Sequence, residues 1–221
     1  MFEGGLRGLP SFTTEEVTRI CHRHLGVGAD GVVMARPSDR APLRMELINS
    51  DGSVPEMCGN GIRCFVKYAV EELGHRTNPL QVETPAGVLD CAWTACSDRP
   101  HEVASVRVAM GAPAMSRASA GMSGQGSSEQ LEVESHGHRF DVTGVGTGNP
   151  HMVVFGDASE ATARTWGPRL TQHEWWPRGV NVEFAEVKAP HHIIVTVWER
   201  GCGLTQACGT GATATAAAAV R

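Results

Sequence analysis

The feature that most constrains this sequence is a pair of matching tetrapeptides, Cys-Gly-Asn-Gly at residues 58–61 and Cys-Gly-Thr-Gly at residues 208–211. Each follows a strand-like apolar run and a polar turn, and each opens a stretch that we expect to be helical. The spacing repeats as well, because Asn49 and Glu199 each stand nine residues before their cysteine. The repeat predicts two similar halves, each presenting one cysteine at the start of a helix, with a cleft between them.

A cysteine at the start of a helix has chemical consequences. The first turn offers unpaired backbone N–H groups and a partial positive charge, so we expect a lowered thiol pKa and an available thiolate. Glycines let the backbone approach a ligand, and the same N–H groups can hold a carboxylate. One thiolate could take a proton from one face of a carbon while the other thiol protonates the opposite face. Preorganised donors would stabilise the charge that develops in between.

The remaining pattern predicts an α+β fold of short strands and few helices, with each mixed or antiparallel sheet curled around a central helix. Helices are expected at 13–25, from Cys58 or Gly59 to Gly74, and from Cys208 or Gly209 onward. Strands are expected at 32–35, 45–48, 80–83, 88–93, 103–109, 131–134, 138–143, 151–155, 181–185 and 192–198. Residues 114–130, rich in Ser and Gly, are expected to form a surface loop or a disordered excursion.

A domain boundary is expected at residues 100–102. The N-terminal domain, residues 1–101, would carry Cys58, and the C-terminal domain, residues 102–221, would carry Cys208. The strand at 103–109 would then open the second domain.

Composition excludes several classes of function. A net charge of −5 without a basic block, and 5% aromatic residues, argue against a nucleic-acid partner. No apolar run approaches the roughly 20 residues of a membrane-spanning helix. The start of the chain lacks the pattern of a signal peptide, and the seven cysteines are an odd number. We therefore expect a cytoplasmic protein with reduced thiols and no membrane partner.

Five sequence blocks, in order, resemble the diaminopimelate epimerase family and extend over nearly the whole chain. They are His-Leu-Gly-Val-Gly-Ala-Asp-Gly at 24–31, Asn-Ser-Asp-Gly-Ser at 49–53 with Glu-Met-Cys-Gly-Asn-Gly-Ile-Arg-Cys at 56–64, Gly-Asn-Pro-His at 148–151, Gly-Val-Asn-Val-Glu-Phe at 179–184, and Trp-Glu-Arg-Gly at 198–201 with Ala-Cys-Gly-Thr-Gly at 207–211. Each block alone is a weak signal, but five in the family's order are specific.

The resemblance implies an amino-acid epimerase that needs neither pyridoxal phosphate nor any other cofactor. It would invert LL-diaminopimelate to the meso form, for lysine and peptidoglycan synthesis, as a cytoplasmic homodimer. It implies that Cys58 and Cys208 are the acid and the base. The resemblance also implies substrate-binding roles for Asn49, Gly59, Asn60, Asn149, Asn181, Glu199, Arg200, Gly209 and Thr210, with His151 as a further candidate.

The two ends depart from the family pattern. No asparagine precedes Asn49, although the family has one near its start, and the chain stops at Arg221, inside the helix that the family continues. The C-terminal domain would therefore be incomplete, and we expect reduced stability or activity relative to a longer family member.

Other interpretations stay open beside the epimerase. A related cofactor-independent racemase or isomerase of the same fold, or a truncated copy without catalysis, would share these motifs. The Gly-x-Gly-x-x-Gly run at 26–31 follows a helix and precedes a strand, which is the reverse of a dinucleotide fingerprint. Zinc is not expected, because five residues separate Cys58 from Cys64 and Cys202 from Cys208.

Overall fold

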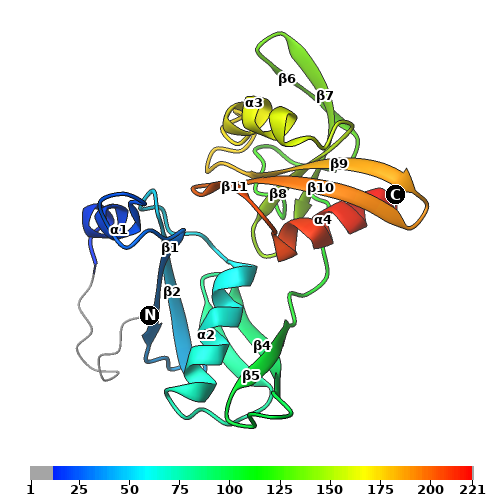
Figure 1. The fold of residues 1–221 in the computed structure, drawn as a ribbon. Helices are drawn as coiled ribbons and strands as arrows, with labels where there is room; N and C mark the ends of the chain where they lie inside the picture. The colour runs from blue at the N-terminus through cyan, green and yellow to red at the C-terminus, as the bar shows by residue number, and fades with distance from the viewer. Residues whose placement is uncertain (1–11, 221) are drawn as a thin grey trace. The chain divides into compact units, whose positions relative to one another are not determined.

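The computed structural model describes residues 12–220, and the chain divides into two units between Met110 and Gly111. Each unit has its own β-sheet and its own helices (Figure 1), which confirms the predicted two-domain α+β class. The expectations for residues 1–10, including the missing asparagine, and for Arg221 lie outside the described residues.

The division falls later in the chain than the predicted boundary at 101/102. Strand β5 (Val103–Val108) pairs antiparallel with β4 (Gly87–Ala95), in a register that runs from Cys91↔Val108 to Ala95↔Val103. β5 is therefore the last strand of the first sheet. The polar residues at 96–102 form the hairpin connection before it, and the backbone N–H of Cys96 donates to the carbonyl of Glu102.

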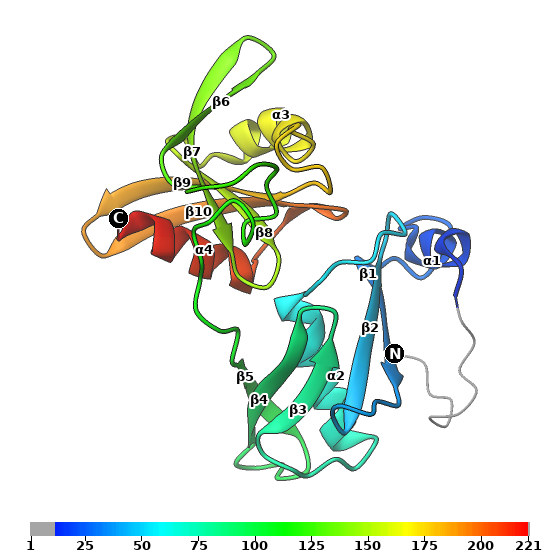
Figure 2. The same ribbon diagram turned by 180° about the vertical axis from the view of Figure 1, so that it is seen from behind.

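Five strands form the first sheet in the order β1-β2-β3-β4-β5. The strands before β4 are β1 (Gly31–Arg36), β2 (Leu43–Asn49) and β3 (Leu80–Thr84). Figure 2 shows β3 between β2 and β4, and β2 and β3 form the parallel pair of this sheet. Burial alternates along β2, where Leu43, Met45 and Leu47 are buried, so one face of the sheet supplies the core.

Helix α2 (Gly59–Glu71) covers that apolar face. Its fully buried side chains recur at helical spacing, which produces an apolar stripe: Ile62, Phe65, Val66, Ala69 and Val70. The other helix of this unit, α1 (Thr14–Cys21), begins at a capping box between Thr13 and Glu16. α1 ends at Cys21, short of the predicted Leu25.

Six strands form the second sheet in the order β11-β10-β9-β8-β7-β6, with β8 and β9 as its parallel pair. The strands are β6 (Leu131–Ser135), β7 (His138–Gly146), β8 (Pro150–Phe155), β9 (Asn181–Ala189), β10 (His192–Glu199) and β11 (Gly203–Thr205). Each sheet thus contains one parallel pair among antiparallel neighbours, as expected of two related halves.

Two helices cover opposite faces of this second sheet (Figure 1). Met152 and Val154 of β8 pack on the side of α3 (Glu160–Leu170), whereas Val153 packs with Ala214 and Ala218 of α4 (Gly209–Ala219). This division follows from the alternation of side chains along a strand. Every residue of α4 is Ala, Gly or Thr, so its backbone can lie close to the sheet.

The second unit departs from the sequence prediction at α3 and agrees with it at residues 114–130. Helix α3, capped by Ser159, was not predicted, because Gly167 and Pro168 interrupt its pattern. Gly167 gives Trp198 its space, since a Cβ there would lie 2.4 Å from Trp198 Cγ. The segment 114–130 is a largely exposed loop, as predicted, and Ser128 anchors it: this residue is fully buried and its hydroxyl donates to the carbonyl of Gly144.

None of the helices within residues 12–220 combines the length and apolar character that a bilayer crossing requires.

Candidate functional site

Cys58 is the N-cap of α2. Its extended backbone (φ −139°, ψ 109°) lets its sulfur reach back over the first turn, where it accepts the backbone N–H of Gly61 at 3.3 Å. A thiol thus occupies the place that a Ser or Asp side chain usually takes at an N-cap. Cys58 as a whole is half-buried.

The other predicted residues of the first unit lie in the turns around Cys58. Asn49, the last residue of β2, is buried, and its Nδ2 donates to Ser53 Oγ at 3.0 Å. On α2, the guanidinium of Arg63 donates to Asn60 Oδ1 and, at 3.2 Å, to the carbonyl of Gly59. Arg63 therefore fixes the orientation of the Asn60 side chain. The amide oxygen of Asn60 faces Arg63, and its amide nitrogen points away from Arg63.

Cys208 is the N-cap of α4 and repeats this geometry in the second unit. Its backbone is extended (φ −127°, ψ 114°) and its sulfur accepts the N–H of Gly211 at 3.4 Å. Cys208 is buried, whereas Cys58 is half-buried, and the hydroxyl of Thr210 lies 3.1 Å from the sulfur of Cys208.

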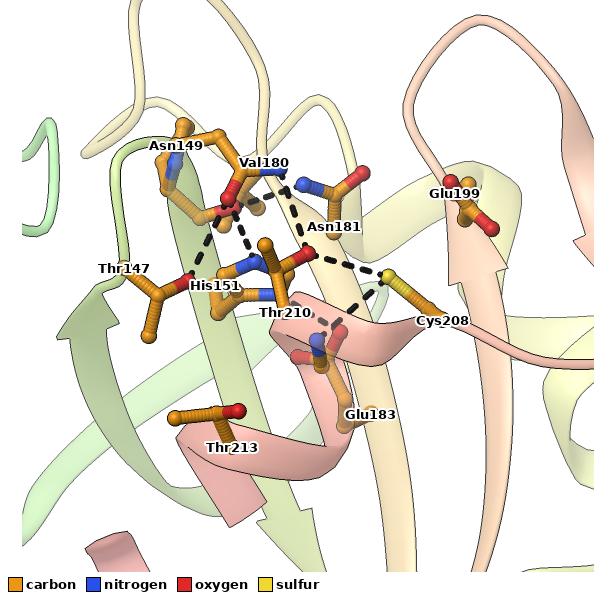
Figure 3. A network of polar contacts seen from close by, with 12 residues as sticks. Thr147, Asn149, His151, Val180, Asn181, Glu183, Glu199, Cys208, Thr210 and Thr213 are labelled. Atoms are coloured by element: carbon orange, nitrogen blue, oxygen red, sulfur yellow. Dashed lines mark hydrogen bonds and ion pairs between the residues drawn. The ribbon is translucent and has the colours of Figure 1, made fainter. Parts of the chain in front are cut away.

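A chain of buried polar side chains continues from Thr210 into the unit (Figure 3). Asn149 Nδ2 donates to Thr210 Oγ1 at 3.5 Å, and Asn149 Oδ1 lies 2.8 Å from His151 Nε2. On the far side of the ring, His151 Nδ1 lies 2.7 Å from Glu183 Oε1. Both His151 and Glu183 are fully buried.

The strand register explains why these polar groups meet under α4. His151 on β8 faces the same side as Val153, whose register partner on β9 is Glu183. This is the side that α4 covers, and Gly211 in the first turn of α4 leaves space for a carboxylate. A Cβ at Gly211 would lie 2.6 Å from Glu183 Oε1. The second glycine of this Cys-Gly-x-Gly motif therefore has a steric cause.

Asn181 and Arg200 are joined by hydrogen bonds at the ends of β9 and β10. Asn181 Nδ2 donates to the carbonyl of Pro150 at 2.9 Å, and Asn181 Oδ1 accepts the backbone N–H of Arg200 at 2.9 Å. The guanidinium of Arg200 donates to the carbonyls of Arg178 and Gly179. These contacts hold the turn after β10 in place.

Glu199 is oriented by a hydroxyl from the next strand. Thr205 Oγ1 on β11 donates to Glu199 Oε1 at 2.6 Å. Because β10 and β11 are antiparallel neighbours, this bond fixes the carboxylate at the end of the hairpin that leads to Cys208.

The environment of Cys208 corrects the expectation of a lowered thiol pKa. Burial, followed by the negative charge of Glu199 and more weakly that of Glu183, raises the pKa of Cys208 from 9.0 to about 12. The hydrogen bonds from Thr210 and from the backbone of Gly211 oppose this rise, but they are weaker than the desolvation. Cys208 is therefore a protonated thiol at neutral pH.

The structure connects many of the predicted residues of the second unit and adds two others. Asn149, His151, Thr210 and Cys208 form one hydrogen-bonded chain. Asn181 is hydrogen-bonded to Arg200, and Glu199 is hydrogen-bonded to Thr205. Glu183 and Thr147, whose hydroxyl donates to Asn149 Oδ1 at 3.3 Å, were not predicted. A signal for Glu183 existed, because it is an acidic residue between Val182 and Phe184 in a predicted strand.

All seven cysteines are present as thiols. Within the part of the chain that the structure describes, no three His, Cys, Asp or Glu side chains gather so that they could hold a metal ion.

Comparison with known proteins gives a consistent result. The family described as "Diaminopimelate epimerase" matches residues 8–116 and 143–221. The chain is 44% identical over 223 residues to the diaminopimelate epimerase of Desulfitobacterium hafniense, covering 99% of this chain and 77% of that protein. It is 46% identical over 202 residues to the diaminopimelate epimerase of Moorella thermoacetica, covering 90% of this chain and 71% of that protein.

Solved structures show the same fold at low sequence identity. A probable proline racemase from Agrobacterium radiobacter superposes with a TM-score of 0.66 at 16% identity, over 99% of this chain and 72% of that one. A hydroxyproline epimerase from Agrobacterium vitis gives 0.65 at 14% identity, over 99% of this chain and 71% of that one. At these identities the likeness concerns the fold alone.

Proposed function

The chain belongs to the diaminopimelate epimerase family, and we propose that it interconverts LL- and meso-2,6-diaminopimelate with Cys58 and Cys208 as the two proton carriers. The observation that carries this proposal is the repeated cap: each unit places a cysteine sulfur over the first turn of a helix that begins Cys-Gly-x-Gly. One thiol on each unit is what a two-base inversion requires.

The environment of Cys208 supports a direction for the first proton transfer. Because Cys208 holds its proton at neutral pH, it acts as the acid in the resting enzyme, and Cys58 acts as the base. The Cys58 thiolate takes the α-proton, the electron pair moves toward the carboxylate, and the Cys208 thiol protonates the opposite face. Afterwards Cys58 is the thiol and Cys208 the thiolate, which is the form that runs the reverse reaction.

The helix starts also provide for substrate binding. The backbone N–H groups of a helix's first turn and its partial positive charge stabilise an anion, so residues 59, 60, 209 and 210 would hold the reacting carboxylate as charge develops on it. The other substrate groups would bind Asn49, Asn149, Asn181, Glu199 and Arg200. His151 would contribute through Asn149, to which its ring is bonded.

The proposal includes the setting in which the enzyme works. The reaction needs no pyridoxal phosphate, because two thiols and fixed donors replace the electron sink. We place the protein in the cytoplasm as a homodimer, serving the synthesis of lysine and peptidoglycan, as its relationship to diaminopimelate epimerases suggests.

The experiment is α-proton exchange in D₂O with LL-diaminopimelate, followed by NMR together with chiral separation of the isomers. The wild-type chain should exchange and epimerise, Cys58→Ala and Cys208→Ala should not, and each Cys→Ser variant should retain only traces, because a hydroxyl is a much poorer base. Full activity in either alanine variant would contradict the two-thiol mechanism.

Proline is the control substrate, since the solved structures of similar fold include a probable proline racemase. Exchange with proline but not with diaminopimelate would reassign the substrate. If calorimetry detects no binding of diaminopimelate at millimolar concentration, the result favours the alternative that this chain is a non-catalytic member of the family.

A further inference from the structure

The second unit contains a buried ionisable pair, and the two-thiol mechanism gives no role to its carboxylate, Glu183. His151 and Glu183 are both fully shielded from solvent, and their side chains lie 2.7 Å apart. Glu183 Oε2 is buried without a hydrogen-bond partner among residues 12–220, so the carboxylate is poorly compensated. A buried polar group of this kind lowers stability unless it is fully bonded, and replacing such a pair by apolar residues is often neutral or stabilising. A contribution to stability therefore does not explain the pair.

The donors and acceptors along the chain of hydrogen bonds from Glu183 to Cys208 set the direction of that chain. Carboxylate and amide oxygens only accept, so His151 between Glu183 Oε1 and Asn149 Oδ1 donates from both ring nitrogens. The Asn149 amide then points its Nδ2 at Thr210 Oγ1. Thr210 Oγ1 thus accepts from Asn149, and its hydroxyl proton can be donated to Cys208 Sγ, 3.1 Å away.

We propose that Glu183 is a positioning residue that, through His151 and Asn149, directs the Thr210 hydroxyl proton onto the sulfur of Cys208. The inference rests on the proposed role of Cys208 as a proton carrier. A hydroxyl that donates to the sulfur stabilises the thiolate left after Cys208 has protonated the substrate. Thr147 supports the same amide orientation, because its hydroxyl also donates to Asn149 Oδ1.

Loss of the Glu183 charge reverses the chain. Without it His151 donates from Nδ1 alone and accepts at Nε2. The Asn149 amide then turns its nitrogen to His151 and its oxygen to Thr210. Thr210 donates to Asn149 and accepts the Cys208 S–H, which stabilises the thiol instead of the thiolate.

A purely electrostatic role for Glu183 predicts the opposite sign. The charged or titratable groups that face Cys208 are Glu199 on β10, Glu183 on β9 and, through the hydrogen-bonded chain, His151 on β8. The negative charge of Glu183 alone raises the pKa of Cys208, so neutralising it would make the thiolate more available. The two mechanisms therefore predict opposite changes in the reactivity of Cys208 when the charge of Glu183 is removed.

The experiment is alkylation of the folded, substrate-free protein with iodoacetamide from about pH 7 to about pH 10, with Cys208 and Cys58 quantified separately by peptide mass spectrometry. In Glu183→Gln, Cys208 should react about tenfold more slowly than in the wild type across this range, because a charge-assisted hydrogen bond to the thiolate is lost. Cys58, on the other unit, is the internal reference and should be unchanged. Faster or unchanged alkylation of Cys208 would overturn the proposal.

Variants of Thr210 are the matched controls. Thr210→Val should slow Cys208 to a similar extent, and adding Glu183→Gln to it should have no further effect, because the route runs through the hydroxyl. In a Thr210→Ser background the hydroxyl remains, and Glu183→Gln should again slow the reaction about tenfold. Additive effects of Glu183→Gln and Thr210→Val would contradict the route.

Thr147→Val provides a second test if Glu183→Gln does not fold. It leaves the buried pair intact and removes one donor to Asn149 Oδ1, so it should slow Cys208 in the same direction. A normal rate in this variant, when Glu183→Gln is insoluble, would count against the proposal. Because alkylation needs no substrate, failure of epimerisation with slowed alkylation would refute the proposed function alone.

Discussion

The carboxylate of Glu183 occupies the space that a side chain at Gly211 would need: a Cβ at Gly211 would lie 2.6 Å from Glu183 Oε1. The equivalent glycine of the first unit is different, because a Cβ at Gly61 would meet its nearest neighbour, Cys58 Sγ, at 3.4 Å. The two Cys-Gly-x-Gly turns thus share a sequence pattern but differ in the space available for a side chain at the second glycine.

Gly211→Ala should destabilise the second unit by about 1 to 3 kcal/mol, because a buried carboxylate must move. Gly61→Ala is the matched control and should be neutral or stabilising by up to about 1 kcal/mol, since alanine favours the helix. Urea unfolding monitored by circular dichroism measures both. Equal effects of the two substitutions would show that Glu183 does not set the limit at Gly211.

The raised pKa of Cys208 predicts a dependence of stability on alkaline pH. Its pKa in the folded state, about 12, lies above its ordinary value of 9.0, so the protonated thiol favours the folded protein. This contribution is fully present below about pH 9 and is lost as the pH rises toward about 12. Cys208→Ser keeps a capping side chain without the titration, and should lose less stability than the wild type between about pH 8.5 and about pH 10.5.

Urea unfolding at the two pH values measures this difference. Burial raises the pKa of Cys91 to about 12 as well, but that residue is the same in both proteins, so its contribution cancels. Parallel pH dependences of the wild type and Cys208→Ser would mean that the folded protein does not hold the Cys208 proton.

Thr205→Val should lower kcat/KM for diaminopimelate by about tenfold, because it removes the hydrogen bond that orients the Glu199 carboxylate. Thr205→Ser retains a hydroxyl and should restore most of the activity. Steady-state kinetics of the three proteins measures the effect. A fully active valine variant would show that Glu199 does not need this hydroxyl.

Arg63→Met should also lower kcat/KM by about tenfold, because the guanidinium no longer holds the Asn60 amide oxygen. Lys67→Met is the control one turn along the same helix, where the ammonium binds Glu71 and the carbonyl of Val103. It removes a cation of similar exposure away from Asn60. Comparable losses of activity in both variants would point to a general effect of charge on α2.

Local sequence patterns predicted the fold class and most strands, because alternation and helical spacing are local signals. They missed α3, where Gly167 and Pro168 weaken the helical pattern and the packing of Trp198 explains the glycine. They also placed β5 in the wrong domain. A strand's own residues do not specify which sheet it joins, and only the pairing of β5 with β4 decides that.

The candidate site shows the same limit. The two cysteines and their caps follow from the sequence, since an N-cap is defined by its neighbours in the chain. The state of the Cys208 thiol does not, because its desolvation and the charges of Glu199 and Glu183 depend on how distant segments pack. Glu183 was overlooked for a related reason: its role appears only where β8, β9 and α4 meet.

The division of the chain between Met110 and Gly111 bears on how such a fold can arise and how it can be split. Each unit is one uninterrupted stretch of polypeptide with its own sheet, its own helix start and its own cysteine. A gene of this design can arise by duplication and fusion of one ancestral half. The same contiguity suits fragment complementation, because each of two polypeptides divided at this junction would contain one complete sheet with its helices.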